Sequence, residues 1–420
     1  MRFIHAADLH IDSPLRGLDR YQGAPVEKLR TATRAALENL VDLAIKETVD
    51  CVLLAGDIYD SDWQDFHTGL YFREQMVRLG RADIPVFIIH GNHDAQGVIS
   101  RQVPQPDNVT VFSSRTAETV TLDSVAVAIH GRSFPNRAVN DDLVPGYPDP
   151  LPGYFNIGLL HTSLTGHQGH DTYAPTDLAT LSAKGYDYWA LGHVHTRQQV
   201  STQPHVVFPG NLQGRHASET GAKGCELVTV TAGRIDSEFI PLDVVRWQRL
   251  TLPVEGIDRL AALPRAFQDA LTPYAQAAPD RLHAVRVTLT GRSELYALEA
   301  RQPGTLAAAI QAAAQDIDDL EVWIEQVRLE LSTPLDRQQA AQRDDAVGEL
   351  LRLVDALAAE PQTLQRWAGE ELGKLLDKVP PEVSAADAPR FDAIDDLRAL
   401  LRDAEATVLA RLAVDGDSSS

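Results

Sequence analysis

Short clusters of acidic, histidine and amide side chains recur through the first half of the chain. Each follows an apolar run, and the clusters are Asp8-x-His10, Gly56-Asp57-x-x-Asp60, Gly91-Asn92-His93-Asp94, His161 and Gly192-His193-x-His195. A mixture of carboxylate, imidazole and amide oxygen donors suits Mn²⁺, Fe²⁺ or Zn²⁺, whereas Mg²⁺ and Ca²⁺ prefer oxygen donors alone. The clusters therefore predict a transition-metal site.

The number of donors indicates two ions instead of one. The predicted ligands are Asp8, His10, Asp57, Asn92, His161, His193 and His195. They exceed what one centre with open positions can use, and a bridging carboxylate would hold a pair of ions roughly 3.5–4 Å apart. Asp57 is the best candidate for this bridge, because Gly56 lets the backbone approach closely. Such a pair can clamp the attacking and leaving oxygens of a phosphodiester.

Alternating strands and helices must position these clusters. Short β-branched runs alternate with helical stretches through about residue 245, which predicts a layered α/β fold. Later runs are closely spaced with fewer helices, as expected for a mixed sheet or two packed sheets. Because ligands collect at the carboxyl ends of strands in such sheets, the clusters are expected to meet at one edge.

The remaining chain predicts further parts. Residues 246–333 read as a small α+β domain, and residues 334–413 as a helical region rich in Ala, Leu and acids. Residues 414–420, which end in Asp-Gly-Asp-Ser-Ser-Ser, are expected to be disordered. The first domain is expected to cover residues 1–245.

Composition excludes several classes of protein. A net charge of −21 argues against coating nucleic acid through a broad basic surface, so any contact with DNA must be local or shared with a partner. Cys51 and Cys225 lack zinc or disulfide spacing and fit a reducing cytoplasm. We expect no export signal, no membrane span and, without a Gly-rich phosphate loop, no ATP hydrolysis.

The clusters resemble the calcineurin-like metallophosphoesterase superfamily. In detail they are similar to the YhaO-type DNA repair exonucleases, relatives of the SbcD nuclease subunit. The segments that carry the resemblance are HAADLHIDSP (5–14), IPVFIIHGNHD (84–94), YDYWALGHVH (186–195) and PGNLQGRH (209–216). The resemblance covers the first 240 residues and implies an α/β/β/α sandwich, with the small α+β domain as a cap.

The resemblance also implies roles for individual residues. The first ion would be held by Asp8, His10, Asp57 and His195, and the second by Asp57, Asn92, His161 and His193. His93 would then protonate or stabilise the leaving oxygen, with Asp94 orienting its ring. Asp60 stands where archaeal and eukaryotic relatives carry a second active-site histidine, so it is expected to support a ligand from behind.

Substrate contacts are expected in two loops. Arg215 and His216 lie in the loop after the last metal cluster and are suited to a phosphate backbone, although turn formation explains the glycines of this loop equally well. His167 and His170 could also reach a substrate, but solvated loop residues are the alternative.

The resemblance implies a Mn²⁺-dependent DNA exonuclease acting at DNA ends, with single-strand endonuclease activity as an addition. The alternatives are a phosphodiesterase for cyclic nucleotides or other small esters, and a docking subunit of an SMC-like coiled-coil ATPase bound by the C-terminal helices. A homodimer through the helix near residues 63–79 is a further expectation.

Overall fold

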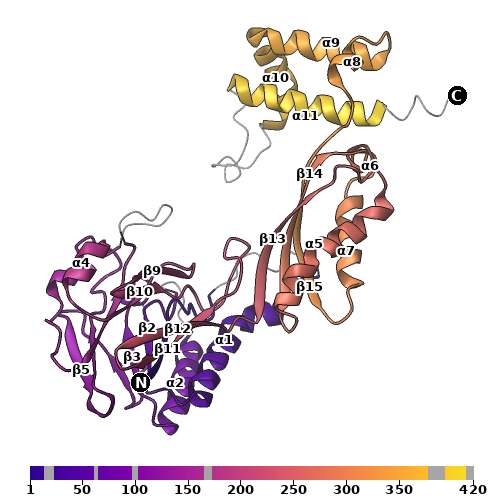
Figure 1. Cartoon of the computed structure of the whole chain (residues 1–420). Helices are drawn as coiled ribbons and strands as arrows, with labels where there is room; N and C mark the ends of the chain where they lie inside the picture. The colour runs from indigo at the N-terminus through magenta and orange to yellow at the C-terminus, as the bar shows by residue number, and fades with distance from the viewer. Residues whose placement is uncertain (14–22, 61–64, 97–102, 165–172, 377–392, 413–420) are drawn as a thin grey trace. The chain divides into compact units, whose positions relative to one another are not determined.

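The computed structural model describes residues 1–13, 23–60, 65–96, 103–164, 173–376 and 393–412 (Figure 1). His167, His170, Trp63 and the predicted tail 414–420 lie outside these residues. The chain forms two compact units. The first comprises Met1–Arg249, Ala278–Val285 and Asp319–Glu325, and the second comprises Leu250–Ala277, Arg286–Asp318 and Gln326–Ser420.

The first unit contains two six-stranded sheets. The first sheet has the order β12-β11-β1-β2-β3-β4. Its strands are β1 (Arg2–Ala6), β2 (Cys51–Ala55), β3 (Val86–Ile89), β4 (Val109–Val111), β11 (Gly224–Thr231) and β12 (Arg234–Pro241). The strands β1, β2, β3 and β4 run parallel, and β11 is antiparallel to β1. Strand β2 is apolar throughout because it is buried on both faces.

The second sheet has the order β5-β6-β7-β8-β10-β9. Its strands are β5 (Glu118–Leu122), β6 (Val127–Gly131), β7 (Phe155–His161), β8 (Tyr188–Gly192), β9 (Gln198–Thr202) and β10 (His205–Phe208). The four central strands, β6, β7, β8 and β10, are parallel. Both sheets therefore have parallel centres whose carboxyl ends can present ligands together.

A shared apolar core holds the two sheets face to face. Phe3, Leu53 and Phe87 from the first sheet pack with Ile157 and Tyr188 from the second, and all are almost fully buried. This packing places the strand ends of the two sheets beside one another, so that residues distant in sequence can share one site.

Helices cover the outer faces of the two sheets. Helices α1 (Val26–Lys46) and α2 (Phe66–Arg81) lie side by side on the first sheet (Figure 1). In α1 the buried residues Leu29, Ala36, Leu40 and Ala44 repeat at spacings that give an apolar stripe for the sheet. Helix α4 (Leu178–Ala183) and the core around Trp189 cover the second sheet. The layers confirm the predicted α/β/β/α sandwich.

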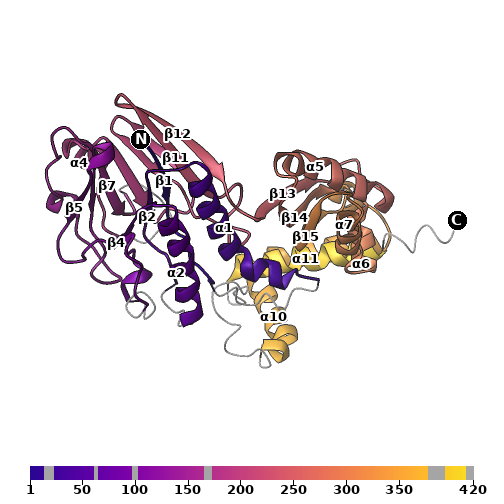
Figure 2. The same cartoon turned by 90° about the horizontal axis from the view of Figure 1, so that it is seen from below.

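The second unit is built on strands whose first residues belong to the first unit. Strands β13 (Val245–Pro253), β14 (Leu282–Arg292) and β15 (Glu321–Ser332) form a sheet in that order. Helices α5 (Leu263–Ala277) and α7 (Thr305–Gln315) pack together beside this sheet (Figure 2), and α6 (Leu295–Arg301) precedes α7.

The predicted helical region is present at the end of the second unit. It comprises α8 (Arg337–Ala341), α9 (Ala346–Ala359), α10 (Pro361–Leu376) and α11 (Ile394–Leu412). Val354, Leu364 and Leu397 form a common core of α9, α10 and α11. The Arg411 side chain donates a hydrogen bond to the Ala300 carbonyl, which ties α11 to α6. Within the described ranges, no helix is both long and apolar enough to span a bilayer.

Leu53→Ala is expected to lower the free energy of unfolding by about 2–5 kcal/mol, because it leaves a cavity between the two sheets. Urea denaturation followed by circular dichroism measures the change. Leu70→Ala removes the same atoms from an exposed position on α2 and should shift the free energy by less than about 0.5 kcal/mol. Equal losses at the two positions would contradict this assignment of the core.

Candidate active site

All seven predicted metal ligands lie at strand ends or just beyond them. Asp8 and His10 follow β1, Asp57 follows β2, Asn92 follows β3, His161 ends β7, and His193 and His195 follow β8. Because β1, β2 and β3 belong to one sheet and β7 and β8 to the other, the ligands meet where the two sheets lie together. The expected convergence is therefore found in the structure.

The ligand loops adopt strained backbone conformations. Asp8, His10 and Asp57 have φ values of 53°, 43° and 54°, in the left-handed region that residues with a side chain seldom occupy. Neighbouring loops hold one another in this state: the Asp8 N–H donates to Gly56 O over 3.0 Å, and the His10 N–H to Asp57 O over 3.1 Å. These backbone conformations direct the three side chains toward the same part of the site.

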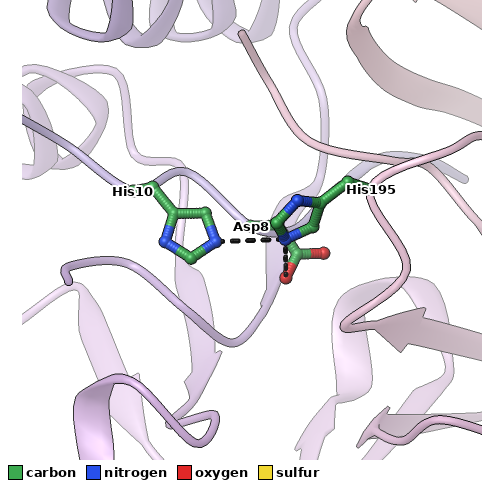
Figure 3. A group of neighbouring side chains, drawn as sticks. All are labelled: Asp8, His10 and His195. Carbon is green, nitrogen blue, oxygen red and sulfur yellow. Dashed lines mark hydrogen bonds and ion pairs between the residues drawn. The ribbon is translucent and has the colours of Figure 1, made fainter. Parts of the chain in front are cut away.

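Asp8, His10 and His195, three of the ligands expected at the first ion, lie close together and could hold a metal ion (Figure 3). The Nε2 atoms of the two histidines lie 3.2 Å apart, and Asp8 Oδ1 is 3.8 Å from His195 Nε2. The other nitrogen of each ring is hydrogen-bonded to a carboxylate. His10 Nδ1 is 2.7 Å from Asp60 Oδ1, and His195 Nδ1 is 2.8 Å from Glu219 Oε1.

These outer contacts determine which ring nitrogen is free to bind a metal. A carboxylate accepts hydrogen bonds, so each Nδ1 carries the proton and each Nε2 presents a lone pair. The lone pairs of His10 and His195 then face one another, an arrangement that a cation between them stabilises. Burial lowers the pKa of His10 to about 4, which keeps this ring neutral near pH 7. The residues present therefore fit a bound metal ion.

Asp57 lies between the two ion sites. Its Oδ1 accepts the His93 backbone N–H over 2.9 Å, which fixes the plane of the carboxylate. Its Oδ2 is 3.5 Å from His161 Nε2 and 4.0 Å from His10 Nε2. This carboxylate thus faces a histidine of each site, which is the geometry a bridging ligand requires.

The second ion site contains His161 and Asn92 beside Asp57. His161 Nδ1–H donates to Ala55 O over 2.9 Å, so Nε2 is the nitrogen that faces Asn92 Oδ1, 3.0 Å away. The His193 ring lies beside the His161 ring, with centroids 5.3 Å apart. The carboxylate of Asp57, the amide oxygen and the imidazoles supply the donor types expected for a transition metal.

The charge distribution also fits a pair of cations. Burial raises the pKa of Asp8 to about 6, while nearby histidines, led by His161, outweigh burial and hold the pKa of Asp57 below its usual range. Burial opposes protonation of His161, but Asp57 raises its pKa to about 9. A bound cation would replace that proton and neutralise both buried carboxylates.

Gly91 makes room for this arrangement. A Cβ atom at this position would collide with the Asp57 carboxylate and the His161 ring. Glycine is therefore required beside Asp57, the expected bridging ligand.

His93 stands beside the metal ligands without belonging to the predicted ligand set. Its ring packs edge-on against His10, with centroids 5.0 Å apart, and its side chain is partly exposed. Its Nδ1 is 3.3 Å from Asp60 Oδ1. Asp60 therefore lies behind His10, as predicted, and also next to His93.

Asp94 has a different position from the one its predicted role requires. Its Oδ2 accepts the backbone N–H groups of Ile58 and Gly91, and its Oδ1 accepts that of Tyr59. Asp94 thus ties the loop after Asp57 to the turn that carries Asn92, and the acid beside the His93 ring is Asp60. The adjacency of His93 and Asp94 in the sequence did not reveal this, because two of the amides that Asp94 binds come from another strand end.

The two predicted substrate residues differ in their placement. Arg215 is turned inward, with its side chain 14% exposed and hydrogen-bonded to Glu219. This geometry does not match the predicted contact with a phosphate backbone. The His216 side chain is 60% exposed, so it alone of the pair faces solvent.

Sequence reasoning did not identify Glu219 or Lys223 as supports of His195. Glu219 holds the His195 ring, and Lys223 Nζ donates to the His195 carbonyl over 2.7 Å. Both residues are buried. Both contacts reach back to His195, which lies outside this loop, so the sequence of the loop carries no signal for them.

Asp57→Asn is expected to reduce the number of Mn²⁺ ions bound and to abolish phosphoester hydrolysis, because a neutral amide cannot bridge two cations. The loss of metal affinity should exceed the roughly 10- to 100-fold typical of residues behind the ligands. Isothermal titration calorimetry measures the stoichiometry. Asp42→Asn, the same change at an exposed position on α1, should leave both properties intact. Unchanged stoichiometry in Asp57→Asn would exclude the bridge.

Comparison with known proteins identifies the two parts of the chain separately. Residues 1–197 match the calcineurin-like phosphoesterase family, and residues 247–332 match the middle domain of the metallophosphoesterase YhaO. The uncharacterized metallophosphoesterase YhaO of Bacillus subtilis (strain 168) is 35% identical over 337 residues, which cover 79% of this chain and 82% of that protein.

Two solved structures are more distant. The protein TT1561 of Thermus thermophilus is 12% identical with a TM-score of 0.35, covering 57% of this chain and 98% of its own. A dimetal phosphatase from Danio rerio is 13% identical with a TM-score of 0.39, covering 58% of this chain and 96% of its own. The match to YhaO extends over both units, and the site has the ligands of a metal-dependent phosphoester hydrolase. The chain therefore belongs to the calcineurin-like metallophosphoesterases and, among them, to the YhaO-like proteins.

Proposed function

We propose that this protein is a Mn²⁺-dependent DNA exonuclease that hydrolyses phosphodiester bonds at DNA ends during DNA repair. The observation that carries the proposal is the position of His93. It is a partly exposed histidine that contacts the ligand His10 while lying outside the ligand set. A histidine in this position can donate a proton to a leaving oxygen. Hydrolysis of a phosphodiester produces such a leaving oxygen.

Different residues of the site have different roles in the proposed reaction. Two divalent ions would activate water and offset the charge of the phosphate. Asp57 and the histidines would hold those ions, and the His93 backbone N–H donates to Asp57 Oδ1, which keeps His93 beside this ligand. Asp60 Oδ1 lies 3.3 Å from His93 Nδ1 and can orient the ring, so that its other nitrogen faces the departing 3′ oxygen and can donate a proton to it.

The second unit supports a large substrate. Hydrolysis of a small ester needs little beyond the first unit, yet the chain continues through a three-stranded sheet with its helices and then a helical region to residue 412. The YhaO middle domain forms part of this continuation. We propose that these residues contact DNA beyond the scissile bond, and that the terminal helices bind an SMC-like ATPase.

With Mn²⁺, the purified protein is expected to degrade end-labelled linear DNA and to leave covalently closed circular duplex intact, because exonucleases require an end. Gel electrophoresis of both substrates measures this, with EDTA as the metal-free control. Rapid hydrolysis of bis(p-nitrophenyl) phosphate or a cyclic nucleotide by a preparation inert toward DNA would instead support the small-ester alternative.

His93→Gln is expected to slow hydrolysis by about 10²- to 10⁴-fold, the usual contribution of a proton-transferring side chain. Mn²⁺ binding should persist because His93 lies outside the predicted ligand set. The rate on linear DNA and calorimetric Mn²⁺ binding should be measured on the same preparation. His67→Gln, at an exposed histidine of α2, is the matched control and should retain full activity. Full activity in His93→Gln would remove the main support for this mechanism.

A further inference from the structure

We propose that Arg215 is a positioning residue that holds His10 and His195 in orientation for the first ion by joining the two carboxylates behind them. This inference concerns the metal site alone and does not depend on the substrate. It replaces the expected contact between Arg215 and a phosphate with an internal role.

Of the two carboxylates beside Arg215, Glu219 is the closer, and the guanidinium also lies 3.3 Å from His195 Nδ1. Arg215 Nη2–H donates to Glu219 Oε1 over 2.9 Å, and the backbone N–H of Arg215 donates to Oε2 over 2.7 Å. The same Oε1 accepts His195 Nδ1–H over 2.8 Å. Asn211 Nδ2 donates to Oε2 over 3.0 Å, which further fixes this carboxylate. Glu219 can therefore hold the His195 ring in one orientation.

Asp60 forms the other half of the connection. Its Oδ1 accepts His10 Nδ1–H over 2.7 Å and lies 3.7 Å from Arg215 Nη1. The contacts thus run from His10 to Asp60, Arg215, Glu219 and His195. They close into a ring across the 3.2 Å gap between the two Nε2 atoms. The ion would occupy one side of this ring and the guanidinium the other.

Burial makes the guanidinium necessary. The Asp60 and Glu219 side chains are 13% and 7% exposed, and two uncompensated carboxylates in this setting would repel one another. Arg215 offers a planar group with several donors, so it can neutralise both at once. Its inward position leaves it little freedom to bind a substrate.

The second ion site is supported differently. His161 is held by a backbone carbonyl, that of Ala55, and this contact does not depend on a charged side chain. Loss of Arg215 should therefore affect the two ions unequally. This inequality distinguishes a positioning role from general support of the fold.

The test uses the full-length variants Arg215→Met and Arg215→Lys. In calorimetric titrations with Mn²⁺, Arg215→Met is expected to bind one ion about 10- to 100-fold more weakly and the other as in the parent protein. Arg215→Lys keeps the positive charge but lacks the planar guanidinium that contacts both carboxylates. Its loss of Mn²⁺ affinity should therefore be intermediate. Thermal unfolding of the metal-free variants reports any effect on the fold separately.

Arg249→Met is the matched control. Arg249 donates to Ala217 O and Ser218 Oγ, so it supports the same loop through groups other than the two carboxylates. Both ions should bind Arg249→Met with parental affinity. In a double-mutant cycle, Arg215→Met combined with Glu219→Gln should cost less than the sum of the single changes.

Several outcomes would overturn the proposal. Unchanged affinity for both ions, or equal weakening of both, would show that Arg215 does not serve the first site selectively. Additive losses in the double-mutant cycle would show that it does not act through Glu219. If Arg215→Met does not fold, the same readings are taken from Arg215→Lys, where equal weakening of both ions again contradicts the inference.

Discussion

The structure of this protein depends on the burial of two carboxylates, Asp8 and Asp57, among imidazole rings where two sheets meet. Isolated buried charges are too costly to persist, so these carboxylates need positive charge beside them. Paired divalent cations would neutralise these charges, so the arrangement of side chains is suited to binding them.

The sandwich supplies the rigidity that such an arrangement needs. Left-handed conformations at Asp8, His10 and Asp57 cost free energy, and they persist because adjacent loops bind one another and the strands beneath are packed on both faces. Parallel strands deliver several ligands to the same edge. Packing in the large inter-sheet core thus offsets the free-energy cost of the strained backbone at the site.

The groups behind the ligands make the two ion sites unequal. Carboxylates hold the histidines of the first site, whereas a backbone carbonyl holds His161 in the second. A carboxylate partner makes an imidazole more basic and a stronger ligand. It also adds negative charge that must be compensated, and the inward-facing Arg215 and Lys223 supply positive charge in that region.

The sequence by itself determined the candidate ligands and the central strands, because apolar runs followed by polar clusters identify buried strands and the residues at their ends. The edge strands β5, β9 and β12 were not predicted, since they are largely exposed and their polar residues resemble loops. Only the tertiary structure decided the roles of Asp94 and Glu219. Their partners come from other strand ends or loops, and the partner of a hydrogen-bonding group depends on how distant segments pack, which local pattern does not encode.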